Sequence, residues 1–153
     1  MRRVPPPPPP RRVVAPSPTE LYSAAVAVLG NDEPVLAGRR AVTSAALARQ
    51  AIESAVDRWL LAQGINGCDN RRQGFACLAA LYPDLKLARQ LHNVWARLSD
   101  ACHAVSYDMP PTTSELEGWF EVVHRFVTSA DSVAMGRSQQ ERAASGGTDA
   151  QNP

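Results

Sequence analysis

The sequence predicts an all-α fold, a bundle of four long helices and one short helix with disordered ends. Three observations support this prediction. Apolar residues recur at helical spacing between residues 17 and 135, and N-cap residues, Gly and Pro divide that stretch into segments. Alternating β-branched runs and hairpin dipeptides, which would indicate strands, do not occur. We therefore divide the 153 residues into an arm over 1–16, a helical bundle over 17–135 and a disordered tail over 136–153.

The N-terminal arm combines proline with arginine. Its prolines Pro5 to Pro10 are consecutive, which favours the polyproline II conformation and excludes helix and sheet. The first twelve residues also hold four arginines and no acid, so the remaining chain, with 12 basic and 15 acidic residues, has a net charge of −3. Such a remainder is not typical of a protein that binds nucleic acid through overall positive charge. The arm is expected to be a semi-rigid disordered segment, or else a docking ligand or a basic arm for RNA or a protein partner.

The first two helices have clear boundaries. Ser17-Pro18-Thr19-Glu20 forms a capping box with proline at the first helical position, so a helix is predicted from there to about Leu29. A long helix follows over about 35–63 and ends at Gly64. Its alanines are abundant, which lets neighbouring helices approach closely.

Three more helices complete the predicted bundle. A short helix spans about 71–81 and stops before Pro83, because the residue before a proline avoids the helical region. Asp84 caps the next helix, which is expected to run to about Tyr107. The last helix begins near Thr112 to Glu115, and its apolar residues lie at helical spacing: Leu116, Trp119, Phe120, Val123 and Val127.

Several classes of protein are excluded or disfavoured by the sequence. No run of about 18 apolar residues exists, so a membrane span is not expected, and prolines stand where a signal peptide would need its apolar stretch. Three cysteines do not suggest a disulfide scaffold, so we expect a cytoplasmic protein. The cysteine spacing does not fit a zinc site, and phosphate-binding loops and hydrolase motifs are missing. No metal and no cofactor is therefore predicted.

The predicted helix over 84–107 carries the residues best suited to chemistry. At about 100° per residue, Leu91, Leu98 and neighbouring apolar residues form one stripe that must be buried. Arg97, Asp100 and His103 fall on the opposite face. Histidine transfers protons near neutral pH, arginine holds phosphate oxygens, and Asp100 is close enough in sequence to pair with Arg97 or to orient His103.

This pattern fits a site that acts on a phosphodiester without a metal. Arg97 and His103 lie about 120° apart around the helix axis, so one helix alone brings them together poorly. A two-fold dimer would combine two such helices into one cleft. The alternative is that all three side chains are simply solvated.

Two segments resemble the HEPN family (higher eukaryotes and prokaryotes nucleotide-binding domain). Residues 45–65, AALARQAIESAVDRWLLAQGI, are similar to the family's long helix, with Gln50, Ala51 and Glu53 followed by an apolar run that ends in Gly-Ile. Residues 97–103, RLSDACH, match the family's Arg-x(4–6)-His motif on the expected later helix. The resemblance covers about residues 20–130.

The resemblance implies a homodimer with the motif at its interface. Many HEPN proteins are metal-independent endoribonucleases that act as toxins or in defence against phage. In these, the RNA 2′-hydroxyl attacks the adjacent phosphate while histidine transfers protons. Arg97, His103 and Asp100 are then the predicted catalytic residues, RNA is the predicted substrate, and an antitoxin or other regulatory protein is a candidate partner.

Three further residues are candidates for RNA binding, namely Arg71, Arg72 and His92. Each has an alternative interpretation as a solvated surface residue. For the whole protein, the alternative function is a non-catalytic HEPN-like dimerisation and interaction module that uses its Pro/Arg arm to bind a partner. An unrelated four-helix domain is a third possibility.

Overall fold

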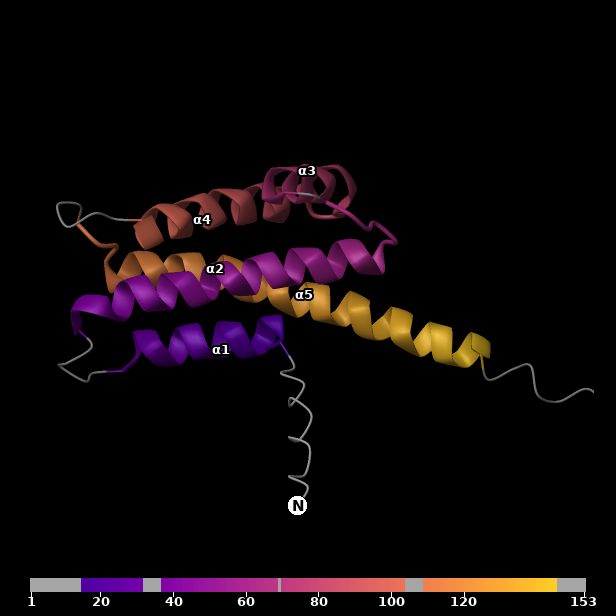
Figure 1. Ribbon diagram of the computed structural model, residues 1–153, viewed down its shortest axis with the longest axis horizontal. Helices are drawn as coiled ribbons and strands as arrows, with labels where there is room; N and C mark the ends of the chain where they lie inside the picture. Colours follow the sequence, from indigo (N-terminus) through magenta and orange to yellow (C-terminus); the bar gives the residue numbers. More distant parts are fainter. Residues whose placement is uncertain (1–14, 32–36, 69, 104–108, 146–153) are drawn as a thin grey trace, which may run out of the picture.

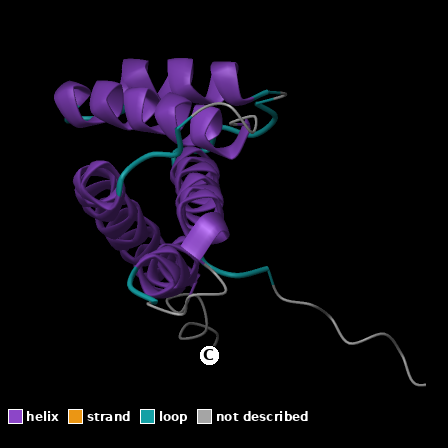
Figure 2. Cartoon of the chain, turned by 90° about the vertical axis from the view of Figure 1, so that its left-hand side faces the viewer, coloured by secondary structure: helices purple, strands orange, loops and turns teal. Residues whose placement is uncertain are grey.

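The computed structural model describes residues 15–31, 37–68, 70–103 and 109–145. These ranges contain five α-helices and no strand (Figures 1 and 2), which confirms the all-α prediction. The helices are α1 (Pro18–Leu29), α2 (Ala37–Ala62), α3 (Arg71–Leu81), α4 (Leu85–His103) and α5 (Thr113–Ser145).

The helix lengths differ from the predicted pattern of four long helices and one short helix. Helices α2, α4 and α5 are long, with 26, 19 and 33 residues, but α1 has only 12 residues and α3 has 11. The C-terminal end also differs, because α5 continues ten residues beyond the bundle limit expected at residue 135. Residues 136–145 are rich in Gln, Glu, Arg and Ala and lack proline, and these residues favour a helix even without an apolar face. The tail prediction was therefore wrong over this segment, while residues 146–153 lie outside the described ranges.

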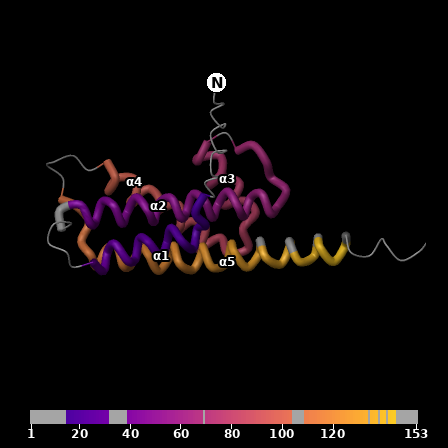
Figure 3. The backbone as a smooth tube through the Cα atoms, turned by 60° about the horizontal axis from the view of Figure 1, so that its bottom comes forward, coloured from indigo at the N-terminus to yellow at the C-terminus, as the bar shows by residue number. Residues whose placement is uncertain are grey.

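Helix α2 is the centre of the bundle. It contacts each of the other four helices, and α5 contacts α1, α2 and α4. The C-terminal part of α5 extends away from the other helices (Figures 1 and 3). This arrangement places α4 and α1 on different sides of α2.

Local capping explains where the helices begin. Ser17 Oγ accepts a hydrogen bond from the Glu20 backbone N–H, and the Glu20 carboxylate accepts one from the Ser17 N–H at 2.7 Å, which confirms the predicted capping box. Asp84 Oδ1 likewise accepts from the Leu87 N–H at 2.9 Å at the start of α4. Such caps each contribute about 1 kcal/mol to helix stability.

Small side chains allow the close packing around α2. The alanines that face its neighbours, Ala45, Ala48, Ala51 and Ala55, are all fully buried. The apolar stripe predicted on α4 is also buried, with Leu91 and Leu98 completely inaccessible. The core thus fixes which face of α4 remains exposed.

The predicted arm lies outside the described residues, apart from Ala15 and Pro16, which are exposed. In the part of the chain that the structure describes, no helix combines the length and apolar character needed to cross a bilayer.

Candidate functional site

The exposed face of α4 carries the predicted catalytic residues. Arg97, Asp100 and His103 are all exposed, on the side opposite the buried Leu91 and Leu98, as the helical projection predicts. Their accessibility leaves them available to a ligand, and it also agrees with the alternative of solvated side chains.

The structure does not bring Arg97 and His103 together within one chain. Six residues along α4 separate them by about 9 Å parallel to the axis. Within the described residues, no hydrogen bond or ion pair joins Arg97, Asp100 or His103 to one another. Arg97 instead acts on the start of α5, where hydrogen bonds from Thr112 lower the pKa of Glu115 and the charge of Arg97 lowers it further. A single chain therefore presents an arginine and a histidine that do not converge.

Charge is unevenly distributed over the bundle. The chain after residue 12 has a net charge of −3, but α4 is locally positive. All charged residues of α4 are exposed: three cations, Lys86, Arg89 and Arg97, against one acid, Asp100. His92 and His103 lie on the same exposed surface. Together these α4 residues form what we call the basic face, and clustered positive charge of this kind suits phosphate groups.

A partly buried carboxylate holds α4 against α2. Glu53 Oε1 accepts hydrogen bonds from Trp95 Nε1 at 2.9 Å and from Arg49 Nε at 3.0 Å. Arg71 Nε lies 3.7 Å from Glu53 Oε2, and the Glu53 side chain is only 17% exposed. The hydrogen bond between Glu53 and Trp95 fixes the position of α4 on α2 and therefore the direction in which its basic face points. Within α4 itself, the Ser99 hydroxyl donates a hydrogen bond to the Trp95 carbonyl at 2.8 Å.

The sequence did not predict that Glu53 joins α2 to α4. Glu53 was noted only as one of the residues that resemble the HEPN family. A signal was present, because Glu53 directly follows the buried Ile52 and, seven residues before Leu60, falls on nearly the same side of the helix as that buried residue. A carboxylate at the edge of a buried stripe needs partners, but the sequence does not reveal which residues supply them.

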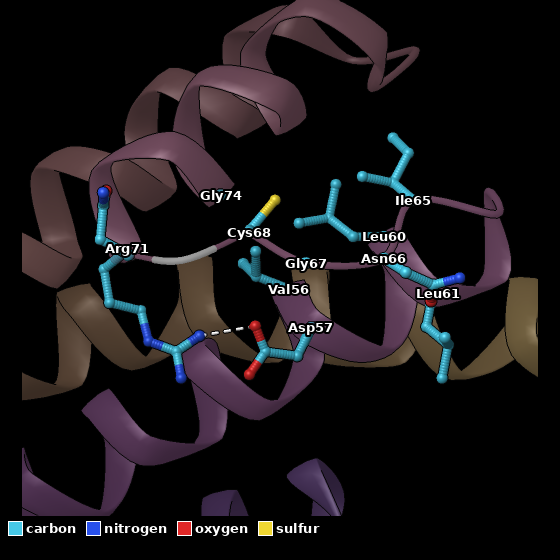
Figure 4. A pocket seen from close by; sticks show the side chains of 11 residues that line it. Val56, Asp57, Leu60, Leu61, Ile65, Asn66, Gly67, Cys68, Arg71 and Gly74 are labelled. Atoms are coloured by element: carbon cyan, nitrogen blue, oxygen red, sulfur yellow. Dashed lines mark hydrogen bonds and ion pairs between the residues drawn. The ribbon is translucent and has the colours of Figure 1, made fainter.

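Of the two predicted RNA-binding arginines, Arg71 is already engaged. Its Nη1 lies 2.6 Å from Asp57 Oδ1 (Figure 4), and this hydrogen bond raises the pKa of Arg71 despite partial burial. Arg71 also borders a cavity of ≈ 500 Å³ between α2 and α3, whose wall includes Leu60, Ile65 and Cys68. Arg72 is exposed and has no ion pair within the described residues, so it is the better of the two for binding an anion.

The third predicted RNA-binding residue, His92, is exposed but packed against aromatic rings. Its imidazole centre lies 5.0 Å from that of Phe75 and 6.2 Å from that of Trp95, and it is nearly parallel to Trp95, with 17° between the planes. His92 therefore connects the basic face to the rings of Phe75 and Trp95.

The three cysteines are half-buried free thiols. Burial raises the pKa of Cys102, and the nearby Arg49 acts in the opposite direction. Within the described ranges, no group of three or more His, Cys, Asp or Glu side chains is arranged to hold a metal ion.

Comparison with protein-family models, with curated proteins and with solved structures returned no significant match. The resemblance to the HEPN family therefore rests on the two segments of the sequence alone.

Proposed function

We propose that this protein is a metal-independent endoribonuclease of the HEPN toxin or defence type, with its active site formed between the α4 helices of a homodimer. The observation that carries the proposal is the basic face of α4, on which Arg97 and His103 are exposed and cations outnumber acids three to one. RNA supplies both the phosphate groups that such a face binds and a built-in nucleophile, the 2′-hydroxyl.

The proposed reaction uses only protein side chains. One His103 accepts the proton of the 2′-hydroxyl, whose oxygen then attacks the adjacent phosphorus. The bond from phosphorus to the 5′-oxygen breaks, and the other protomer's His103 donates a proton to that oxygen. The products are a 2′,3′-cyclic phosphate and a free 5′-hydroxyl. Arg97 binds the non-bridging oxygens and stabilises the charge that develops on them.

In the proposed homodimer, a second protomer supplies the convergent arginine and histidine that one chain lacks. Because Arg97 and His103 diverge on their own helix, two α4 helices related by a two-fold axis would place two arginines and two histidines around one cleft. Ala96 is exposed at the middle of the face, and its small side chain permits a close approach of the two helices. The Glu53–Trp95 contact would keep each α4 in the orientation that this cleft requires.

Cleavage of RNA in the presence of EDTA tests the chemistry. His103→Ala should reduce the rate at least about 100-fold, in line with the contribution of a positioned acid or base. Arg97→Ala should reduce it by a similar factor. His124→Gln is the matched control, because His124 is also an exposed histidine but lies on α5 against Tyr22. Cleavage that persists in His103→Ala, with the fold intact by circular dichroism, would contradict the mechanism.

Crosslinking tests the composite site. Ala96→Cys places a thiol on the exposed face without disturbing the hydrogen bond of Ser99 to Trp95. We expect a short bifunctional thiol reagent to join two chains of this variant, and the unmodified chain, with its three half-buried cysteines, is the control. A protein that cleaves RNA as a monomer by light scattering would rule out the dimeric site.

A further inference from the structure

A groove with aromatic walls lies between α1 and the first half of α5. Tyr22 is its central residue: its ring centre lies 6.1 Å from that of Phe120 in an edge-to-face contact and 5.3 Å from that of His124. Val26 and Leu29 of α1 continue the apolar wall around a cavity of ≈ 620 Å³. Tyr22 is half-buried and Val26 is exposed, so a ligand in the groove would cover apolar surface that the bundle leaves open.

The rim of this groove is acidic. Helix α1 and the first half of α5, residues 113–129, together contain four carboxylates, Glu20, Glu115, Glu117 and Glu121, against one arginine, Arg125, and one histidine, His124. Glu20 and Glu115 serve as capping residues, whereas Glu117 and Glu121 are exposed beside the cavity and form no ion pair within the described residues. Arg40 of α2 also lines the cavity, so two carboxylates face one guanidinium there.

The N-terminal arm has the complementary chemistry. It carries four arginines without an acid, at positions 2, 3, 11 and 12, around a run of six prolines. Aromatic grooves bind proline-rich segments because the polyproline II conformation is already ordered, so little conformational entropy is lost on binding. Carboxylates at the rim of such a groove suit arginines that flank the prolines.

We infer that the groove between α1 and α5 is a binding site for a basic, proline-rich peptide, and that its occupant is the N-terminal arm of the same chain. Arg11 and Arg12 would lie near Glu117 and Glu121, with the prolines against the apolar wall.

The length and attachment of the arm fit this assignment. Helix α1, with 12 residues, is about 18 Å long. From Ser17, where the arm joins α1, the five residue steps to Arg12 span at most about 18 Å. This is enough to reach Glu121, which lies ten residues, about 15 Å, along α5 from the Asp131 that Thr19 contacts. The arm joins α1 at Ser17, beside Thr19, which hydrogen-bonds Asp131 of α5. This attachment gives the arm a high effective concentration at the groove, which favours it over a free peptide. The inference does not depend on the proposed nuclease activity, because the groove and the basic face of α4 share no residue.

Trypsin cleavage of the full-length protein tests the inference, because Arg11–Arg12 and Arg12–Val13 are cleavable bonds in the arm. Initial rates at these bonds would be measured by mass spectrometry and compared with a synthetic peptide of residues 1–20. When opening is fast, proteolysis reports the population of the undocked state, and we expect cleavage about tenfold slower in the protein than in the peptide. At 1 M NaCl, where the screening length falls to about 3 Å, most of this protection should disappear.

Variants identify the binding groups. The double variant Glu117→Gln/Glu121→Gln should lower the protection to about twofold or less, because both exposed carboxylates are lost. Asp100→Asn is the control: it removes an exposed carboxylate from α4, outside the groove, and should leave the protection unchanged.

Three results would overturn the inference. Equal cleavage rates in the protein and the peptide would show that the arm does not dock. Unchanged protection in the Glu117→Gln/Glu121→Gln variant would place the arm elsewhere. Protection that increases with protein concentration would show that the groove holds the arm of a second copy instead of its own.

Discussion

Replacing Glu53 tests how α4 is held in place. The change Glu53→Ala removes the acceptor of the Trp95 indole N–H, a hydrogen bond of 2.9 Å to a carboxylate that is 17% exposed. Hydrogen bonds to charged groups contribute about 1.5–3 kcal/mol. The ion pairs with Arg49 and Arg71 are partly exposed, so they add at most about 1 kcal/mol each. We expect the free energy of unfolding to fall by about 2–4 kcal/mol.

Urea denaturation followed by tryptophan fluorescence would measure this loss. Glu53→Gln keeps an oxygen that can accept the indole proton and should lose about half as much stability, which separates the hydrogen bond from the charge. A double-mutant cycle with Trp95→Phe isolates the pairwise term, which we expect to be about 1–2 kcal/mol. A coupling energy near zero would refute the view that this contact anchors α4 to α2.

Three further predictions concern stability. Gly64 has φ +78°, so Gly64→Ala should lower the free energy of unfolding by about 1 kcal/mol, whereas Gly118→Ala, in an open position inside α5, should raise it by up to about 1 kcal/mol. Thermal melts of the two variants measure both changes. Leu98→Ala should lower the free energy of unfolding in urea by about 2–5 kcal/mol, because Leu98 is 0% exposed; a loss under 1 kcal/mol would mean that α4 is not packed as described. Hydrogen bonds from Ser17 and Thr112 lower the pKa values of Glu20 and Glu115 in the folded protein, so their stabilisation is complete above the unfolded pKa of about 4.3 and is lost as pH falls through the folded values. The melting temperature of Glu20→Gln/Glu115→Gln should accordingly depend less on pH between about 3 and 5 than that of the unmodified chain, and parallel curves would contradict the assignment.

The parts of the fold that depend on neighbouring residues were predictable from the sequence. Ser17 with Glu20 forms a capping box within four residues, and Gly64 follows the long helix with the positive φ that glycine favours. The exposed face of α4 was predictable for the same reason, because the helical period alone separates Leu98 from Arg97 and His103.

Interactions between helices were not predictable in this way. Arg71 resembles a free cation in the sequence, but the fold brings it to Asp57, 14 residues earlier in the chain. Glu53 and Trp95 are 42 residues apart, and only the packing of α4 on α2 makes them partners. The length of α5 was missed for another reason: an apolar pattern was used to place the end of the helix, whereas residues 136–145 are helical without one.

The extension of α5 beyond its neighbours has a consequence for local unfolding. Val123 and Phe126 are fully buried, so their amides should exchange with solvent only when the whole bundle opens. Met135, nine residues after Phe126, is 69% exposed, and a helical segment with few tertiary contacts is only marginally stable in water. Protection from hydrogen exchange should therefore fall steeply along one continuous helix. The boundary of the cooperative unit would lie inside α5, near Asp131, rather than at a loop.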